Sequence, residues 1–263
     1  MTDWARGVAA TPSVSIVIAV KNAAATLDGC LKSCIEQDYE PKELIVIDGG
    51  STDGSLEKIR AHASALAYFV SEPDRGIYHA WNKALKLIQG EWVCFLGADD
   101  YWLKPTSLSE MMALAQYPEV NFVCSQIVRI PGEGWSPELF GGHFDRRGIK
   151  WGMTVAHTGM LHHRSLFDEF GLFDESYRIA GDYEFLLRAA HAIRSAYWGK
   201  PTVAMGTGGI SSTRQRIVFE EGRRALACSG NGGLFWAWWF FIRAWSKYLL
   251  KYSFRRAVGG GSR

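Results

Sequence analysis

Two adjacent carboxylates, Asp99 and Asp100, follow the apolar run 93–96 and the small residues Gly97 and Ala98. Such a run predicts a buried strand, and the carboxyl ends of parallel strands face the ligand crevice of an open α/β sheet. Neighbouring carboxylates repel each other unless a positive charge lies beside them. A hard divalent cation that also holds a diphosphate meets this need. The alternative is that Asp100, or a later Ser or Thr, caps the next helix. Taken alone, the pair favours the cap.

Strands and helices alternate ahead of this acid pair. Residues 14–20 and 44–47 are rich in β-branched residues and predict fully buried strands, and residues 66–70 predict a third, shorter strand. Apolar periodicity predicts helices over 26–38, from about residue 55, and over 77–89. This alternation predicts an α/β fold with a doubly wound parallel sheet.

The second half of the chain is less regular. Residues 131–150 are rich in Gly and Pro, which predicts a loop or an exposed hairpin. Elsewhere the pattern predicts strands over 120–130 and 196–205, and helices over 107–116, 164–170 and 182–192.

Composition indicates a soluble globular protein with a basic end. The 263 residues are 48% hydrophobic and 21% charged, which is ordinary for such proteins. The net charge is +2, but residues 214–263 hold ten Lys or Arg and two acidic residues. The five cysteines form no CxxC pair, so we expect reduced core thiols in a cytosolic protein. We expect neither a signal peptide nor a membrane span, because no segment of about twenty uncharged apolar residues occurs.

Five segments follow one another in a fixed order: PSVSIVIAVKN, LIVIDGGSTDGS, SEPDRGIYHAWNKAL, GEWVCFLGADD and FGLFDESYRIAGDYEFLLR. In this order and spacing they resemble the family 2 glycosyltransferases, above all the bacterial enzymes that build O-antigen and related surface polysaccharides. The resemblance covers about residues 13–212. It implies the GT-A fold, with a Rossmann-like, mostly parallel sheet flanked by helices. It also implies sugar transfer from a nucleotide-diphosphate sugar, which we expect to be UDP-linked.

The resemblance implies a base pocket at the ends of the first two strands. Ala19, Val20 and Asn22 would line this pocket, and Asp48 would accept a hydrogen bond from the N–H of a uracil-like ring. A simple Asx turn at Asp48 is the alternative.

A second nucleotide-binding segment is implied after the third strand. Asp74, Arg75 and Gly76 match family positions close to the nucleotide, and Lys83 follows them on the predicted helix. Arg75 could meet a phosphate or the base, or it could be a solvated loop cation. The family usually has Asp where this chain has His79, so the role of that acid does not carry over.

The same resemblance assigns roles to the acid pair and to one later carboxylate. Asp100 would coordinate Mg²⁺ or Mn²⁺, which would disperse the charge of the diphosphate leaving group, and Asp99 would face the ribose. Asp182 would be the catalytic base of an inverting reaction, and a carboxylate at a helix start tends to stay ionised. An N-cap role for Asp182 is the alternative, and Glu184 is a second candidate base. His157 could contact phosphate, orient the acceptor or be structural.

The end of the chain is both aromatic and basic. Residues 234–242 (LFWAWWFFI) are apolar throughout, and Lys or Arg follows at positions 243, 247, 251 and 255. On a helix the basic residues form one face and the aromatic residues the other, a composition typical of a helix in a membrane interface. The helix could also pack on the catalytic domain or on another subunit. We therefore expect a flexible N-terminus over 1–12, a catalytic domain over 13–213 and a helical membrane-interface tail over 214–263. The nucleotide half of the catalytic domain would end near residue 102 and the acceptor half would begin at 103.

The resemblance implies an acceptor saccharide linked to polyprenyl diphosphate. Together with the basic and aromatic tail, it leads us to expect a peripheral enzyme on the inner face of the cytoplasmic membrane. A non-catalytic sugar-nucleotide or lipid-binding scaffold is the alternative, but the joint presence of Asp48, Asp99, Asp100 and Asp182 argues against it. A dehydrogenase is disfavoured because AVKNAAA stands where GxGxxG would follow the first strand. Nucleic-acid binding is disfavoured because the aromatic and basic residues gather only in the tail. Homo-oligomer formation stays open.

Overall fold

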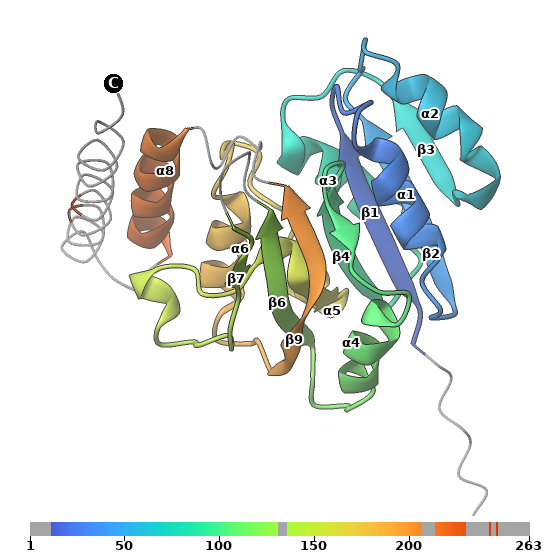
Figure 1. Cartoon of the computed structure of the whole chain (residues 1–263). Coiled ribbons are helices and arrows are strands. Elements are labelled where there is room, and N and C mark those ends of the chain that lie inside the picture. The colour runs from blue at the N-terminus through green and yellow to red at the C-terminus, as the bar shows by residue number, and fades with distance from the viewer. Residues whose placement is uncertain (1–11, 131–135, 207–213, 230–241, 243–245, 247–263) are drawn as a thin grey trace, which may run out of the picture.

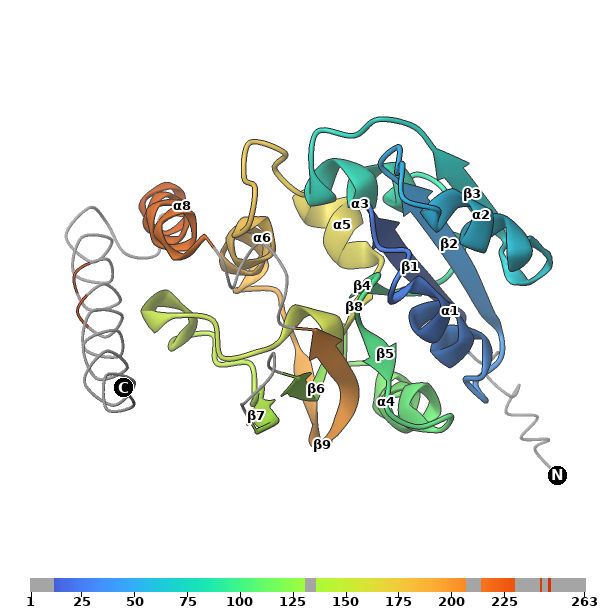
Figure 2. The same ribbon diagram turned by 45° about the horizontal axis from the view of Figure 1, so that its top comes forward.

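The computed structural model describes residues 12–130, 136–206 and 214–229, together with residues 242 and 246. Within this part of the chain, one mixed sheet carries helices on both of its faces (Figure 1, Figure 2). The predicted flexible N-terminus up to residue 11 lies outside the described residues. So does the aromatic and basic tail beyond residue 229, apart from the two positions named above.

The first half of the chain forms the parallel part of the sheet. Its strands lie in the order β3-β2-β1-β4 and are β1 (Val14–Val20), β2 (Lys42–Asp48), β3 (Tyr68–Ser71) and β4 (Trp92–Gly97). The segments between them contain α1 (Leu27–Ile35), α2 (Ser55–Ala61), the short 3₁₀ helix η1 (Ala63–Ala65) and α3 (Ile77–Leu85). The predicted α/β fold with its mostly parallel sheet is confirmed here, although α1 and α3 end three and four residues earlier than predicted.

Alternate residues of these strands enter two separate apolar cores. Val17, Ile45 and Phe95 pack with residues of α3 on one face of the sheet, whereas Ile16 and Val46 pack with residues of α1 and α2 on the other. All five side chains are buried, and each such burial contributes about 1.5–3 kcal/mol. Burial on both faces explains why these strands read as continuous apolar runs rather than as alternating ones.

The second half extends the sheet with mixed strand directions. Strand β8 (Met160–His163) lies between β4 and β6 and is antiparallel to both, and β6 then pairs with β9 in parallel. The short strands β5 and β8 were not predicted. The elements of this half are β5 (Tyr101–Trp102), α4 (Ser107–Ala115), β6 (Phe122–Ile130), β7 (Glu138–Phe140), η2 (Ile149–Trp151), η3 (His157–Gly159), β8, α5 (Ser165–Phe170), α6 (Gly181–Ala189), β9 (Ser195–Gly206) and α8 (Gln215–Cys228).

Two expectations need correction in this half. Helix α8 falls in the segment assigned to the tail, but it packs beside α6 (Figure 1), and its Ala225 and Leu226 belong to the core. The packed structure therefore continues past residue 213. Cys228 is exposed, although the four other cysteines are buried and all five are free thiols. No helix among the described residues is long and apolar enough to cross a membrane.

Two glycines provide a matched test of the packing. A Cβ at Gly90 would lie 2.6 Å from the backbone nitrogen of Ser15 in the central strand β1, whereas a Cβ at Gly29 in α1 meets nothing within 4 Å. We predict that Gly90→Ala lowers the free energy of unfolding by about 1–3 kcal/mol, since the strand backbone cannot give way. Gly29→Ala should raise it by about 0.5–1 kcal/mol. Urea unfolding of both variants measures this difference, and equal midpoints would contradict the packing around Gly90.

Candidate active site

The order of the strands reverses at β1, because β2 and β3 lie on one side of it and β4 on the other. Ligand crevices of open α/β sheets lie at such points, at the carboxyl ends of the strands. The register pairs Val20 with Asp48, and Asp48 with Ser71 on β3. It also pairs Ala19 with Gly97 at the end of β4. The structure thus brings the predicted base-pocket residues and the acid pair to one edge of the sheet.

Asp48 is fully buried at this edge. Its carboxylate accepts a hydrogen bond from the backbone nitrogen of Ser51 at 3.0 Å and further bonds from the hydroxyls of Ser51 and Ser71. The turn expected as the alternative is therefore present. A carboxylate has about four acceptor positions, so the predicted hydrogen bond to a base would be shared with these donors, and that role stays a prediction.

The loops after β1 and β2 are joined by hydrogen bonds. The Lys21 ammonium donates to the carbonyls of Gly49 at 2.7 Å and Gly50 at 2.9 Å. The Asn22 amide oxygen accepts from the Thr52 nitrogen at 2.9 Å, and Asn22 has a positive φ of 49°. The side chain of Asn22 therefore shapes the edge of the pocket. The sequence does not predict this bridging role of Lys21, since its only signal is a single cation directly after a buried strand.

Asp74 lies against the loop that follows Asp48. A Cβ on Gly49 would stand 2.3 Å from a carboxylate oxygen of Asp74, so only glycine leaves room for this approach. The other oxygen of Asp74 accepts from the nitrogen of Gly76 at 3.1 Å. Gly76 precedes α3 with φ 134°, a conformation that favours glycine. The structure thus joins Asp74 and Gly76 to the predicted nucleotide edge.

Arg75 and Lys83 are engaged with carboxylates of the protein. Arg75 forms an ion pair with Glu175, and its side chain is 69% exposed. This exposure agrees with the alternative of a solvated loop cation, although the side chain also has a protein partner. Lys83 pairs with Glu72 at 2.9 Å. Contacts of these two cations with a nucleotide would require exchange of these partners, and their binding roles stay predictions.

The acid pair forms the turn between β4 and β5. Asp100 accepts hydrogen bonds from the nitrogens of Gly97 at 2.8 Å and Gly206 at 3.3 Å. A Cβ on Gly206, the last residue of β9, would lie 2.4 Å from a carboxylate oxygen of Asp99. The helix-cap alternative for Asp100 is wrong, because the next helix, α4, begins only at Ser107. The pair instead links the ends of β4 and β9.

Burial and a neighbouring charge govern the protonation of Asp100. Asp100 is 3% exposed, and burial, together with the adjacent Asp99 charge, raises its pKa to about 7. Asp99 is half-buried. No group of three or more His, Cys, Asp or Glu side chains able to hold a metal occurs among the described residues. Two carboxylates fit Mg²⁺ or Mn²⁺ when substrate phosphates and water complete the coordination, so the residues suit a metal shared with a diphosphate.

Asp182 lies at the second position of α6, with 16% of its side chain exposed. One oxygen accepts from the Tyr183 nitrogen at 2.8 Å and lies 3.2 Å from the Tyr78 hydroxyl, whose single proton it shares with the Ile179 carbonyl at 2.5 Å. Burial raises the pKa of Asp182 to about 6. The effect of burial on the pKa is therefore larger than the opposite effect expected from the helix terminus. The N-cap residue is Ala180 rather than Asp182. Glu184 pairs with Arg188 at 2.9 Å and does not share the Asp182 contacts.

His157 lies beside Asp182 within an aromatic cluster. Its ring stacks on Trp81 with 4.5 Å between centroids and contacts Phe95 at 5.5 Å. Burial lowers the pKa of His157 well below its ordinary value, so the ring is neutral. Its Nδ1 lies 3.8 Å from an Asp182 oxygen, too far for a hydrogen bond. The stacking accounts for its burial, and a role toward the acceptor stays a prediction.

Glu221 on α8 holds the segment that precedes Asp182. Its carboxylate accepts hydrogen bonds from the nitrogens of Arg178 at 2.8 Å, Ile179 at 2.9 Å and Ala180 at 2.9 Å. Hydrogen bonds to charged groups contribute roughly 1.5–3 kcal/mol each, so Glu221 fixes the entry into α6. The sequence gives no signal for this residue, because the contact spans more than forty positions.

Comparison with known proteins gives a family and a fold. The sequence profile of the family described as Glycosyl transferase family 2 matches residues 15–171. The match includes Asp48, Asp99 and Asp100 and ends before Asp182. A PGL/p-HBAD biosynthesis glycosyltransferase of Mycobacterium tuberculosis is 29% identical over 257 residues, covering 95% of this chain and 97% of that protein. A cholesterol galactosyltransferase of Borreliella burgdorferi is 35% identical over 115 residues, covering 43% of this chain and 32% of that protein.

Solved structures of glycosyltransferases share the fold. S. aureus TarS in complex with UDP matches with a TM-score of 0.66 at 22% identity, covering 82% of this chain and 65% of that chain, slightly under two thirds of it. The mannosyltransferase PcManGT from Pyrobaculum calidifontis, in complex with GDP-Man and Mn²⁺, matches with a TM-score of 0.66 at 20% identity, covering 96% and 76%. At these identities the likeness establishes the GT-A fold.

The buried carboxyl of Asp182 predicts a pH-dependent stability. Its pKa is about 6 in the folded protein against 3.8 ordinarily, so the folded state loses stability as pH rises from about 4 through 6. Tyr78, Tyr183, the neutral His157 and Glu221 face this carboxyl or its helix. We predict that Asp182→Asn, which keeps the two acceptor contacts, raises the free energy of unfolding by about 1–3 kcal/mol at pH 8. The gain should vanish near pH 4.

Urea unfolding at pH 4, 6 and 8 measures this linkage, with Glu184→Gln as the control for loss of a charge on the same helix. A constant difference between wild type and Asp182→Asn across this range would show that the carboxyl titrates normally.

Proposed function

The chain belongs to glycosyl transferase family 2, and we propose that it transfers a sugar, with inversion, from a nucleotide-diphosphate sugar to a hydroxyl of a lipid-linked saccharide. The observation that carries this proposal is the placement of Asp182. The Tyr78 hydroxyl, two residues after Gly76 in the predicted nucleotide segment, directs its single proton mainly to the Ile179 carbonyl at 2.5 Å and lies 3.2 Å from a carboxylate oxygen of Asp182. A single aromatic side chain therefore joins the candidate base to the predicted donor site.

Asp182 would act as the general base. As the acceptor oxygen attacks C1 of the donor sugar, Asp182 takes the hydroxyl proton, and the C1–O bond breaks with its electrons moving to the diphosphate. Inversion follows from attack on the face opposite the leaving group. A base must be largely ionised yet basic enough to accept a proton, and the pKa of Asp182, raised by burial to about 6, suits that task near neutral pH.

The acid pair would handle the leaving group. Asp100, with Asp99 beside it, would hold Mg²⁺ or Mn²⁺, whose charge would stabilise the diphosphate as it leaves. Gly97 and Gly206 keep the two carboxylates against the ends of β4 and β9, so the chain positions these oxygens before any ligand binds. The Mn²⁺ in the complex of the related mannosyltransferase structure supports this assignment.

Donor and acceptor are proposed from the relatives and from the sequence. TarS has been solved with UDP and UDP-GlcNAc, and PcManGT with GDP-Man, and among these we favour a UDP-sugar. The relative named as a cholesterol galactosyltransferase supports an acceptor with a lipid part. We propose a saccharide on polyprenyl diphosphate, used in bacterial surface-polysaccharide biosynthesis. The basic and aromatic tail would hold the enzyme on the inner face of the cytoplasmic membrane.

Replacement of the base provides the first test. We predict that Asp182→Asn lowers kcat by about 10²–10⁴-fold, while the donor dissociation constant changes less than about twofold, because the amide keeps the contacts with Tyr78 and Tyr183. Glu184→Gln, two residues away and paired with Arg188, should keep kcat within a few-fold of wild type. A larger loss in Glu184→Gln than in Asp182→Asn would reassign the base. Donor binding without transfer in the wild type would favour the scaffold alternative.

Thermal unfolding provides the second test. With Mn²⁺ present, we predict that UDP-sugars raise the Tm more than GDP- or dTDP-sugars, since a ligand that binds only the folded state stabilises it by mass action. EDTA should remove most of the shift and stop transfer, and Asp100→Asn should raise the Mn²⁺ concentration needed for half-maximal shift by about tenfold or more. Full transfer activity in EDTA would exclude the metal from the reaction.

A further inference from the structure

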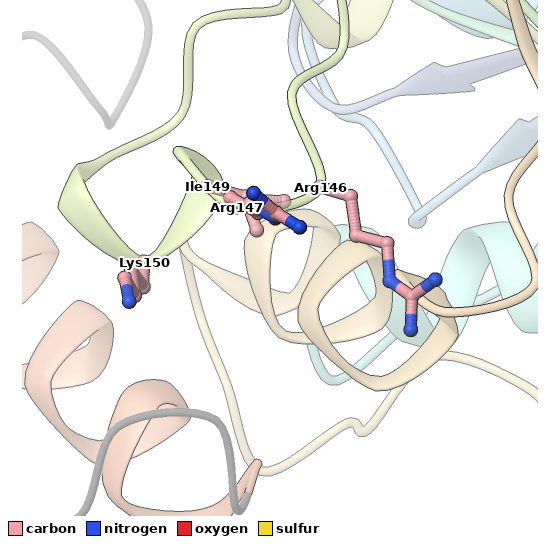
Figure 3. A pocket seen from close by; sticks show the side chains of 4 residues that line it. All are labelled: Arg146, Arg147, Ile149 and Lys150. Atoms are coloured by element: carbon pink, nitrogen blue, oxygen red, sulfur yellow. The ribbon is translucent and has the colours of Figure 1, made fainter.

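A cavity of about 390 Å³ is lined by residues within 146–150, in the segment between β7 and η3, and neither Asp99 nor Asp100 lines it (Figure 3). Three of the four residues that line it carry a positive charge: Arg146, Arg147 and Lys150, with Ile149 as the fourth. In Figure 3 the side chains of Arg146 and Lys150 extend toward opposite ends of the segment. A concave surface lined by three cations suits a ligand that carries several negative charges spread along its length.

The short segment that carries these cations is held in place by its own backbone. The Ile149 nitrogen donates to the Asp145 carbonyl at 2.8 Å, and the Trp151 nitrogen donates to the Gly148 carbonyl at 2.8 Å. Ile149 is 4% exposed and belongs to the core. Lys150 therefore projects from an anchored 3₁₀ turn, and Arg146 and Arg147 project from the turn directly before it, which lowers the entropy cost of binding a ligand here.

Asp145, the acidic residue of this segment, forms no ion pair with the neighbouring arginines among the described residues. The Asp145 carboxylate accepts from the Arg147 nitrogen at 2.9 Å. It also lies so close to Gly148 that a Cβ there would be 2.3 Å from its oxygen. Asp145 thus closes its own turn, and none of the ion pairs between described residues involves Arg146 or Arg147.

The cavity is connected to the candidate base by two hydrogen bonds. The Tyr183 hydroxyl donates to the Ile149 carbonyl at 2.7 Å, and the Tyr183 nitrogen donates to Asp182 at 2.8 Å. The basic segment therefore contacts α6, the helix of Asp182, and in Figure 2 it lies on the α6 and α8 side of the sheet, away from β1–β3. A ligand group held here would lie beside α6, the helix that carries the candidate base.

We propose that Arg146, Arg147 and Lys150 form a second anion site, which binds the diphosphate of the acceptor's carrier lipid. This inference rests on the proposed function, in which the acceptor saccharide is attached to a diphosphate. Arginine suits this ligand because its planar guanidinium donates two parallel hydrogen bonds to phosphate oxygens. The two diphosphates would then bind differently: the donor's through a cation held by Asp99 and Asp100, and the acceptor's directly through protein cations.

Direct binding of inorganic pyrophosphate to the full-length protein tests the site without any transfer reaction. In EDTA the acid pair repels this anion, so calorimetry reports mainly on the basic cavity. We expect Arg146→Ala/Arg147→Ala to weaken binding at least about tenfold, and Arg146→Lys/Arg147→Lys to weaken it less. The matched control is Arg60→Ala/Lys86→Ala, which removes the same charge from exposed positions near α2 and α3 and should bind like wild type. Absent binding in the wild type, or equal weakening in the control, would overturn the proposal.

Acceptor kinetics and vesicle binding distinguish the diphosphate of the carrier lipid from the phosphate of membrane headgroups as the ligand of this site. With a polyprenyl-diphosphate-linked acceptor in detergent, the Arg146→Ala/Arg147→Ala enzyme should show an acceptor KM raised about tenfold or more, with donor KM and kcat near those of wild type. If pyrophosphate affinity is unchanged but binding to phosphatidylglycerol vesicles is lost, the cations contact membrane headgroups and the proposal fails. A third outcome is that the enzyme does not use a polyprenyl-diphosphate-linked acceptor, although pyrophosphate binding depends on Arg146 and Arg147. This would support the anion site and contradict the proposed acceptor.

Discussion

Burial of the Asp182 carboxylate is the constraint on which the rest of the site depends. A carboxylate removed from water is costly unless donors lie beside it. Here the Tyr183 nitrogen donates to it, and the Tyr78 hydroxyl lies 3.2 Å away, sharing its proton with the Ile179 carbonyl. Tyr78 comes from α3, more than one hundred residues earlier, and its ring fills the space beside Gly181 that a Cβ would need. Glu221 holds the preceding segment from α8. Asp182, the candidate base, is therefore positioned by both halves of the chain, although its own helix is short.

The acid pair shows the same dependence on distant contacts. Asp99 and Asp100 follow β4 directly, but their surroundings are completed by Gly206 at the end of β9, 106 residues after Asp100. Neither Gly97 nor Gly206 could carry a side chain without displacing these carboxylates. The turn consequently ties the parallel half of the sheet to the mixed half at the edge where a ligand would bind. A change in this turn would alter both the carboxylates and the junction of the two halves.

The sequence allowed the parallel half to be predicted because β1, β2 and β4 are buried on both faces and so appear as uninterrupted apolar runs. Strand β8 was missed because His162 and His163 break that pattern, although His162 is buried. At the site, sequence order and strand ends were enough to gather Asp48, Asp74, Asp99 and Asp100 at one edge. The positions of Lys21, Tyr78 and Glu221 were not predictable, since their roles exist only as contacts between distant segments.

The arrangement of charge suits the proposed role of Asp182 as a base between two phosphate-bearing substrates. An ionised Asp182 repels any diphosphate that approaches it, and burial weakens the screening that water would provide. A reaction near Asp182 therefore needs positive charge on both sides. On the donor side the protein supplies carboxylates, which can act on a diphosphate only through a cation. On the α6 side it supplies Arg146, Arg147 and Lys150, which need no metal. Donor and carrier would thus be told apart by the charge that each side presents, before the sugars themselves are recognised.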